Sequence, residues 1–269
     1  MRISRNYLAK LRFVVLSSSV IACLFPLFGC QKEARVPQNA VDSGDEKIAA
    51  LKITEADQLY QGREDMAKAR VAVATLRQAV TADYGSYEAA WKLSRASFYV
   101  GDHTDSDDEA DDMFRAGIEA GKAAVKLRGD KPEGHFWLGA NYGGDAQRST
   151  LASLSTVRDI RSEMETVIQL DEKFQGGSAY LALGRLYLKA PKVLGGNTSK
   201  AIDYLKKGLT ISNNSLMKYY LAEAYVAENR DAEAKKLIEE IMIMSPDPQY
   251  VAEHKDAIAK ANKLKEKIG

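Results

Sequence analysis

The sequence predicts an all-α protein in which pairs of helices stack one after another into a repeat array. The chain has 269 residues, of which 45% are apolar and 28% charged, enough apolar surface for a sizeable core. A small residue inside a helix lets a second helix approach closely, and a tyrosine three positions later lies on the same face. This arrangement occurs three times, at Leu138-Gly139 with Tyr142, Leu183-Gly184 with Tyr187, and Leu221-Ala222 with Tyr225.

The last copy fixes the register of the repeat unit. With Leu221 at position seven, small residues fall at positions eight and twenty, larger apolar residues follow, and a proline ends the unit: Ala222, Ala234, Ile238, Ile241 and Pro246. Proline cannot continue a helix interior. This is the pattern of a tetratricopeptide repeat, and it predicts an α-solenoid of about five helix pairs plus a C-terminal cap helix.

Apolar residues at helical spacing place the helices in order along the chain. The first pair, a degenerate unit, begins near Lys47 and continues over 66–82. The cap helix is rich in Lys and Ala, a polar composition that suits an outer face. The second unit is expected to begin at Tyr87, with its second helix at 108–127, and the third at Pro132, with its second helix at 152–170. The fourth unit is expected over 177–212, the fifth over 214–246, and the cap helix over 249–267.

The first 29 residues have the pattern of a secretory signal. Four basic residues precede an uncharged stretch over 13–28, which is shorter than the roughly 20 residues that a membrane span needs. The stretch ends at Leu27-Phe28-Gly29-Cys30, which resembles a bacterial lipobox. We therefore expect residues 1–29 to be a lipoprotein signal peptide and Cys30 to carry lipid. The alternative is a plain secretory signal in which Cys30 is incidental.

The segment after the signal has the composition of a tether. Residues 30–46 are mostly polar and contain Pro and Gly, so we expect a lipidated cysteine and flexible linker before a helical domain over 47–269. Loss of the signal removes four basic and no acidic side chains and takes the formal charge from +1 to −3. That balance argues against a nucleic-acid partner. Gln31 follows the cysteine, which in lipoprotein sorting favours the outer membrane, facing the periplasm.

Extra residues recur between the two helices of three units. Position eight to position twenty spans 12 residues in the fifth unit but 17, 21 and 22 in the fourth, third and second (Ala222 to Ala234, Gly184 to Ala201, Gly139 to about Ile160, Arg95 to about Gly117). We expect a rim along one edge, over 101–112, 143–151 and 191–199, that binds a protein partner. The alternative is length drift in surface loops. The candidate rim residues are Asp105, Asp108, Arg148, Lys192 and Asn197.

Polar and aromatic residues gather in the third unit. An amide or an arginine beside aromatic rings can orient a small carboxylate. The candidate ligand cleft comprises His135, Trp137, Asn141 and Tyr142, within two turns of one helix, and Arg158 and Arg161, which share a face of the next. The alternatives are that His135 is a structural residue bonded to a neighbouring helix and that the arginines face solvent.

Catalytic and metal chemistry have little support in the sequence. The three histidines, at positions 103, 135 and 254, lack metal-ligand spacing. The acidic run over 101–112 lacks the glycine and the glutamate that an EF-hand calcium loop needs. No nucleophile triad or phosphate-binding glycine loop is present. We therefore expect no enzyme activity, no metal and no cofactor.

Three stretches resemble a known family. They are PEGHFWLGANYGG from Pro132, VRDIRSEMETVIQLDEKFQGGSAYLALGRLY from Val157 and KAPKVLGGNTSKAIDYLKKGL from Lys189. With the lipobox, they resemble the T component of tripartite ATP-independent periplasmic (TRAP) transporters, the TatT family, over roughly residues 47–245. A similar helical unit occurs in eukaryotic regulators of microtubule dynamics, so the pattern alone does not prove transport.

The resemblance implies a periplasmic lipoprotein with tetratricopeptide-like helices that forms a homotrimer with a cleft through each subunit. It also implies a periplasmic solute-binding protein as partner and a small organic acid as cargo. The alternative is a general periplasmic tetratricopeptide scaffold for envelope protein assembly, with no small ligand. The aromatic and arginine residues near Trp137 and Arg161 discriminate the two, because a dry packed core there would favour the scaffold.

Overall fold

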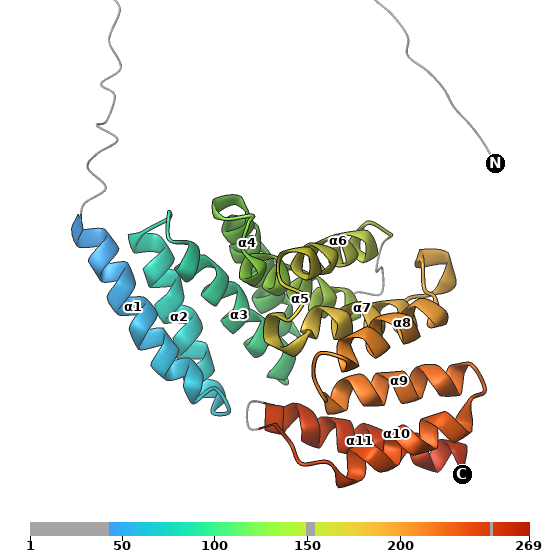
Figure 1. Ribbon diagram of the computed structural model, residues 1–269. Coiled ribbons are helices and arrows are strands. Elements are labelled where there is room, and N and C mark those ends of the chain that lie inside the picture. The colour runs from blue at the N-terminus through green and yellow to red at the C-terminus, as the bar shows by residue number, and fades with distance from the viewer. Residues whose placement is uncertain (1–42, 149–153, 248–249) are drawn as a thin grey trace, which may run out of the picture. The chain divides into compact units, whose positions relative to one another are not determined.

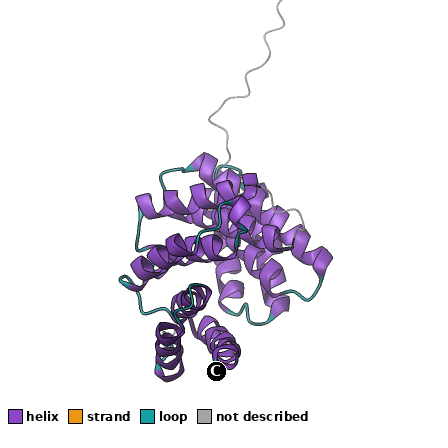
Figure 2. Cartoon of the chain, turned by 90° about the vertical axis from the view of Figure 1, so that its right-hand side faces the viewer, coloured by secondary structure: helices purple, strands orange, loops and turns teal. Residues whose placement is uncertain are grey.

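The computed structural model describes residues 43–148, 154–247 and 250–269. The expected signal peptide, Cys30, most of the tether and residues 149–151 of the predicted rim lie outside the described residues. Within them all regular secondary structure is helical (Figures 1 and 2). The α-helices are α1 Ser43–Gln61, α2 Met66–Ala82, α3 Tyr87–His103, α4 Asp107–Leu127, α5 Pro132–Arg148, α6 Leu154–Leu170, α7 Ser178–Lys189, α8 Thr198–Leu209, α9 Ser215–Ala227, α10 Asp231–Ile243 and α11 Val251–Ile268; short 3-10 turns, η1 Phe174–Gly176 and η2 Lys192–Leu194, lie between them.

The helices pack as consecutive pairs. Each odd-numbered helix from α1 to α9 contacts the even-numbered helix after it, and α11 contacts both α9 and α10. Neighbouring pairs also contact each other: α4 packs against α5, and α8 packs against α9. The predicted all-α array of five pairs and a final helix is therefore confirmed. None of the helices in the described ranges is long and apolar enough to cross a membrane.

Side-chain caps explain where several helices begin. The side chains of Ser86 and Ser106 accept hydrogen bonds from backbone N–H groups in the first turns of α3 and α4, and Asn197 and Asn214 do the same for α8 and α9. Such caps satisfy donors that a helix end otherwise leaves unpaired. The helix starts are thus set locally, one residue at a time.

Small residues set the distance between paired helices. A Cβ atom built on Gly184 would lie 2.4 Å from Leu205 Cγ, and one on Gly139 would lie 2.7 Å from Met164 Cε. These contacts confirm position eight in the third and fourth units. In the second unit the register is wrong by one residue: Ser94 Oγ donates to Gly117 O at 2.8 Å, while Arg95 turns toward α1. The reason is size, because serine fits this close approach and arginine does not.

The core is a series of local clusters. One joins α8 to α11, a second joins α5 to α8, and a third joins α1 to α4. Leu205, Met217, Ile238 and Ile241 are fully buried in the first cluster. Each helix pair therefore completes its core against its neighbours, as stacked repeats require.

The extra residues of units two and three lengthen helices rather than turns. α3 continues to His103 and α5 to Arg148, so the expectation that the extra residues form turns is wrong for 101–103 and 143–148. The Phe114 ring packs against Gly101 and Gly144, which leave it room inside those extensions. The fourth unit does carry a longer turn over 190–197, which includes η2. Packing of Phe114 is the physical reason that the extra turns stay helical.

Candidate functional site

His135 links the turn before α5 to α6. Its Nδ1 lies 2.6 Å from Glu163 Oε2, its Nε2 lies 3.0 Å from Gly129 O, and its side chain is 10% exposed. The hydrogen bond to Glu163 raises the pKa of His135, since both ring nitrogens face acceptors and only the doubly protonated ring can donate to both. The geometry gives His135 a structural role between neighbouring helices.

Asn141 and Trp137 belong to the packed interior. Asn141 Nδ2 donates to Trp137 O at 2.7 Å and to Ser94 O at 3.0 Å, and the side chain is fully buried. Trp137 is 9% exposed, with the rings of Phe136 and Phe98 at 5.0 and 5.8 Å. The Asn141 amide nitrogen is thus occupied by protein acceptors, while its Oδ1 is buried without a partner among the described residues. That Asn141 orients a ligand stays a prediction.

The remaining predicted cleft residues lie in different surroundings. Tyr142 is half-buried, with the Lys122 ammonium 5.9 Å from its ring centre. Arg158 is 68% exposed, with its Nε 3.8 Å from Asp159 Oδ1, while Arg161 is half-buried. The six residues predicted as a cleft are therefore divided between a packed core and a solvent-exposed part of α6.

Charged pairs tie together the helix ends at the predicted rim. Arg148 Nε donates to Asp111 Oδ1 at 2.8 Å and Arg148 Nη2 donates to Asp107. With Gln147 these three residues line a hollow of about 360 Å³. Arg70 from α2 makes a bidentate pair with Glu109, at 2.6 and 2.8 Å, which lowers the pKa of Glu109 to about 2.

The other predicted rim residues differ in what they can offer a partner. Asp108 is exposed in the first turn of α4 and Asp105 just before that helix, and Lys192 is exposed in η2. Asn197 is exposed too, but its Oδ1 accepts from Lys200 N at 2.9 Å and caps α8. Its side-chain oxygen is thus used to cap a helix, which the sequence did not predict.

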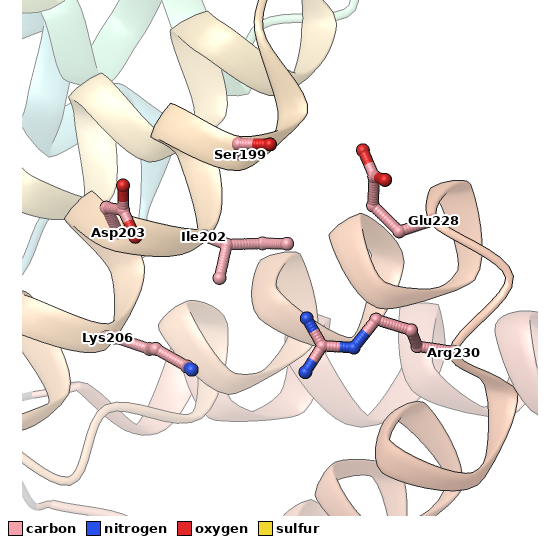
Figure 3. A pocket seen from close by; sticks show the side chains of 6 residues that line it. All are labelled: Ser199, Ile202, Asp203, Lys206, Glu228 and Arg230. Carbon is pink, nitrogen blue, oxygen red and sulfur yellow. The ribbon is translucent and has the colours of Figure 1, made fainter.

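A second hollow lies between α8 and the turn from α9 to α10 (Figure 3). It has a volume of about 280 Å³. Figure 3 shows the carboxylates of Asp203 and Glu228 on one side and the cationic ends of Lys206 and Arg230 on the other. Ser199 and Ile202 complete its lining. The sequence does not predict this hollow, because its walls come from separate helices.

Comparison with known families decides the classification. A family model described as TRAP transporter T-component matches residues 103–267, more than half of the chain. The chain belongs to the TRAP transporter T-component family. The T-component chain is thus an accessory component of a transport system, which implies a membrane-associated envelope location. No curated protein sequence matches it.

Solved structures support the fold of this T-component. TTC0263, a thermophilic TPR protein of Thermus thermophilus, is 18% identical with a TM-score of 0.59, covering 80% of this chain and 99% of its own. Pseudomonas aeruginosa PilF is 16% identical with a TM-score of 0.53, covering 84% and 93%. At these identities the likeness shows the tetratricopeptide-like fold alone. Among the described residues, no group of three or more His, Cys, Asp or Glu side chains is placed to hold a metal ion.

Proposed function

We propose that this T-component is a lipid-anchored lipoprotein that docks a periplasmic solute-binding protein and so assists uptake of a small organic acid. The family match over 103–267 carries the proposal. The lipobox ending at Cys30 supports an anchor, with the protein on the outer membrane facing the periplasm. A stacked helical array offers a long surface to a protein partner, which suits an accessory role.

The start of α4 is the docking surface that we propose. Asp105 and Asp108 are exposed there, while the Arg148 pairs to Asp107 and Asp111 hold the ends of α4 and α5 together. Exposed charges on a rigid support act mainly on partner choice and association rate. We infer that the partner presents a basic patch to this surface.

Capture from a detergent extract of cells that express a solute-binding protein tests the proposal. Wild-type chain should retain that protein, and the double variant Asp105→Lys/Asp108→Lys should retain about tenfold less, because two attractions become repulsions. A matched control, Asp231→Lys/Glu239→Lys on α10, should capture normally. Recovery of no solute-binding protein by the wild type would contradict the proposal.

A general periplasmic scaffold is the second candidate. The burial of Trp137 and Asn141 favours it, because these residues fill a packed core where a ligand cleft was predicted. The same capture experiment separates the two functions: envelope assembly proteins without any solute-binding protein would favour the scaffold.

A further inference from the structure

Arg95 lies among aromatic rings on the side of α3 that faces α1. Its Cζ lies 4.0 Å from the ring centre of Tyr60, in the last turn of α1, and 5.1 Å from that of Trp91, one turn earlier on α3. Only 19% of the Arg95 side chain is exposed. Flat aromatic rings favour a guanidinium through both stacking and cation–π attraction. The rings therefore hold the guanidinium in one place.

The guanidinium is short of hydrogen-bond acceptors. It has five donors, yet among the described residues its only protein partner is Asp57, whose Oδ1 lies 3.3 Å from Arg95 Nη2. Arg95 Nε is buried without a partner. The other Asp57 oxygen is held at 2.5 Å by Lys92 Nζ, which also bonds Glu88. A largely buried charge with so few bonds is unusual, and its remaining N–H donors can serve an added acceptor.

Cationic and acidic side chains both surround these aromatic rings. Arg63 lies over the rings of Tyr60 and Tyr99, at 4.9 and 5.4 Å, so it joins Lys92 and Arg95 around one aromatic group. The carboxylates of Asp57 and Glu88 are in ion pairs with Lys92 or Arg95. Burial and the carboxylates of Glu64, Asp102 and Glu253 raise the pKa of Tyr99, but among the described residues none of these three carboxylates pairs with Arg63 or Arg95. Burial lowers the pKa of Arg95, which agrees with a charge that the protein compensates incompletely.

We propose that Arg95, Tyr60 and Trp91 form a binding site for an organic carboxylate with an apolar body. The carboxylate supplies the acceptors that Arg95 lacks, and the apolar body lies against the aromatic rings. A neutral ligand of the same shape gains only the ring contacts. The inference deepens the proposed function and rests on it for the choice of an organic acid as cargo.

The position of the site is specific to this part of the chain. Tyr60, Trp91 and Arg95 precede the residues 103–267 that match the family model. They also lie apart from Arg158 and Arg161, where the sequence predicted the arginine anchor. The combination sought there, an arginine beside a tryptophan and a tyrosine, occurs instead at Arg95.

Titration of the purified full chain with phenylacetate and hexanoate tests the site, with phenylacetamide and hexanamide as neutral matches. Calorimetry gives the affinity, and the NMR signal of the Trp91 indole N–H reports the position. The acids should bind and shift this signal, and the amides should bind about tenfold more weakly or worse. Arg95→Gln should weaken acid binding by about tenfold or more, because the charged hydrogen bonds are lost.

Two further variants keep the test decisive. Arg95→Lys retains the charge but loses the planar fork, so its affinity for the acids should fall between those of wild type and Arg95→Gln. Arg77→Gln removes an exposed arginine from α2 and should bind the acids like wild type. Circular dichroism melting must show that the Arg95 variants fold; if Arg95→Gln does not, Arg95→Lys alone decides.

Failure of the acid-binding site can be distinguished from failure of partner docking. No acid binding, equal binding of acids and amides, or full affinity in a folded Arg95→Gln or Arg95→Lys variant would each overturn the site. Capture of a solute-binding protein is measured separately. Capture without acid binding would leave the docking role standing, whereas acid binding without capture would leave this site standing and overturn the docking role.

Discussion

His135 joins two structural elements through both of its ring nitrogens. The Glu163 and Gly129 acceptors fix the ring between α6 and the turn before α5, and the pKa of the imidazole is raised as a result. A raised folded-state pKa means that this stabilisation is complete below the unfolded value of about 6.5 and is lost as pH rises through the folded value. The hydrogen bonds of His135 thus stabilise the third unit in a pH-dependent way.

These hydrogen bonds predict that the effect of His135→Gln on the free energy of unfolding depends on pH. At pH 6 the variant should lose roughly 1.5–3 kcal/mol in free energy of unfolding, the range for hydrogen bonds that involve a charged group. At pH 9 the difference from wild type should shrink, because the neutral ring cannot donate to both acceptors. Urea unfolding of both proteins at the two pH values measures it. A difference that does not change with pH would contradict a protonated His135.

Cys30 lies outside the described residues, and its role is a proposal that one residue change can test. Cys30→Ala removes the thiol that would carry lipid, so the protein should move from the membrane fraction into the soluble periplasm. Fractionation of cells with immunoblotting measures the shift. The neighbouring control, Gln31→Ala, keeps the thiol and should stay with the membranes. If Cys30→Ala still fractionates with the membranes, the proposal of a lipid anchor at Cys30 is contradicted.

The sequence predicted the helices well, because a helix depends on a local pattern of residues. It predicted the partners of individual side chains less well, because those come from other helices. The spacing of Leu221, Ala222 and Tyr225 gives helix pairs directly, whereas the extension of α5 depends on Phe114 of another helix fitting against Gly144. The surroundings of the predicted cleft residues were not predictable for a related reason. Polarity marked Asn141 as unusual, but its acceptors come from α3 and its own helix, and nothing in the sequence places them.

Two helical glycines differ in the space around them, so alanine substitutions at the two positions should have opposite effects on stability. Gly184→Ala places a methyl against Leu205 and should destabilise the protein by roughly 1–3 kcal/mol through overpacking. Gly143→Ala, in α5, meets nothing within 4 Å and should stabilise by up to about 1 kcal/mol through helix propensity. Thermal melting of both measures the contrast, and an unchanged melting temperature for Gly184→Ala would refute the register.

At the scale of the whole molecule, binding features are distributed over the repeat array. The Arg95 site belongs to α1 and α3, the charged pairs of Arg148 to α4 and α5, and the second hollow to α8–α10. Each rests on a local core, so a surface can change with little effect on distant units. This arrangement suits a component that holds a partner at one place and a ligand at another.

The oligomeric state follows from the family resemblance and remains a proposal. The purified chain should run as a homotrimer, with a mass by light scattering three times that of one subunit. Dilution over two orders of magnitude should be included, because association depends on concentration. A monomer at every concentration would contradict the trimer but not the docking proposal.

We propose that the exposed start of α4 meets a solute-binding protein in the cell. A photo-crosslinking amino acid at position 108, in place of Asp108, tests it most directly, with the same amino acid in place of Glu239 as the control. The proposal predicts a crosslinked product from position 108 that contains a periplasmic solute-binding protein, and none from position 239. No such product from position 108, in cells that express that protein, would contradict the claim.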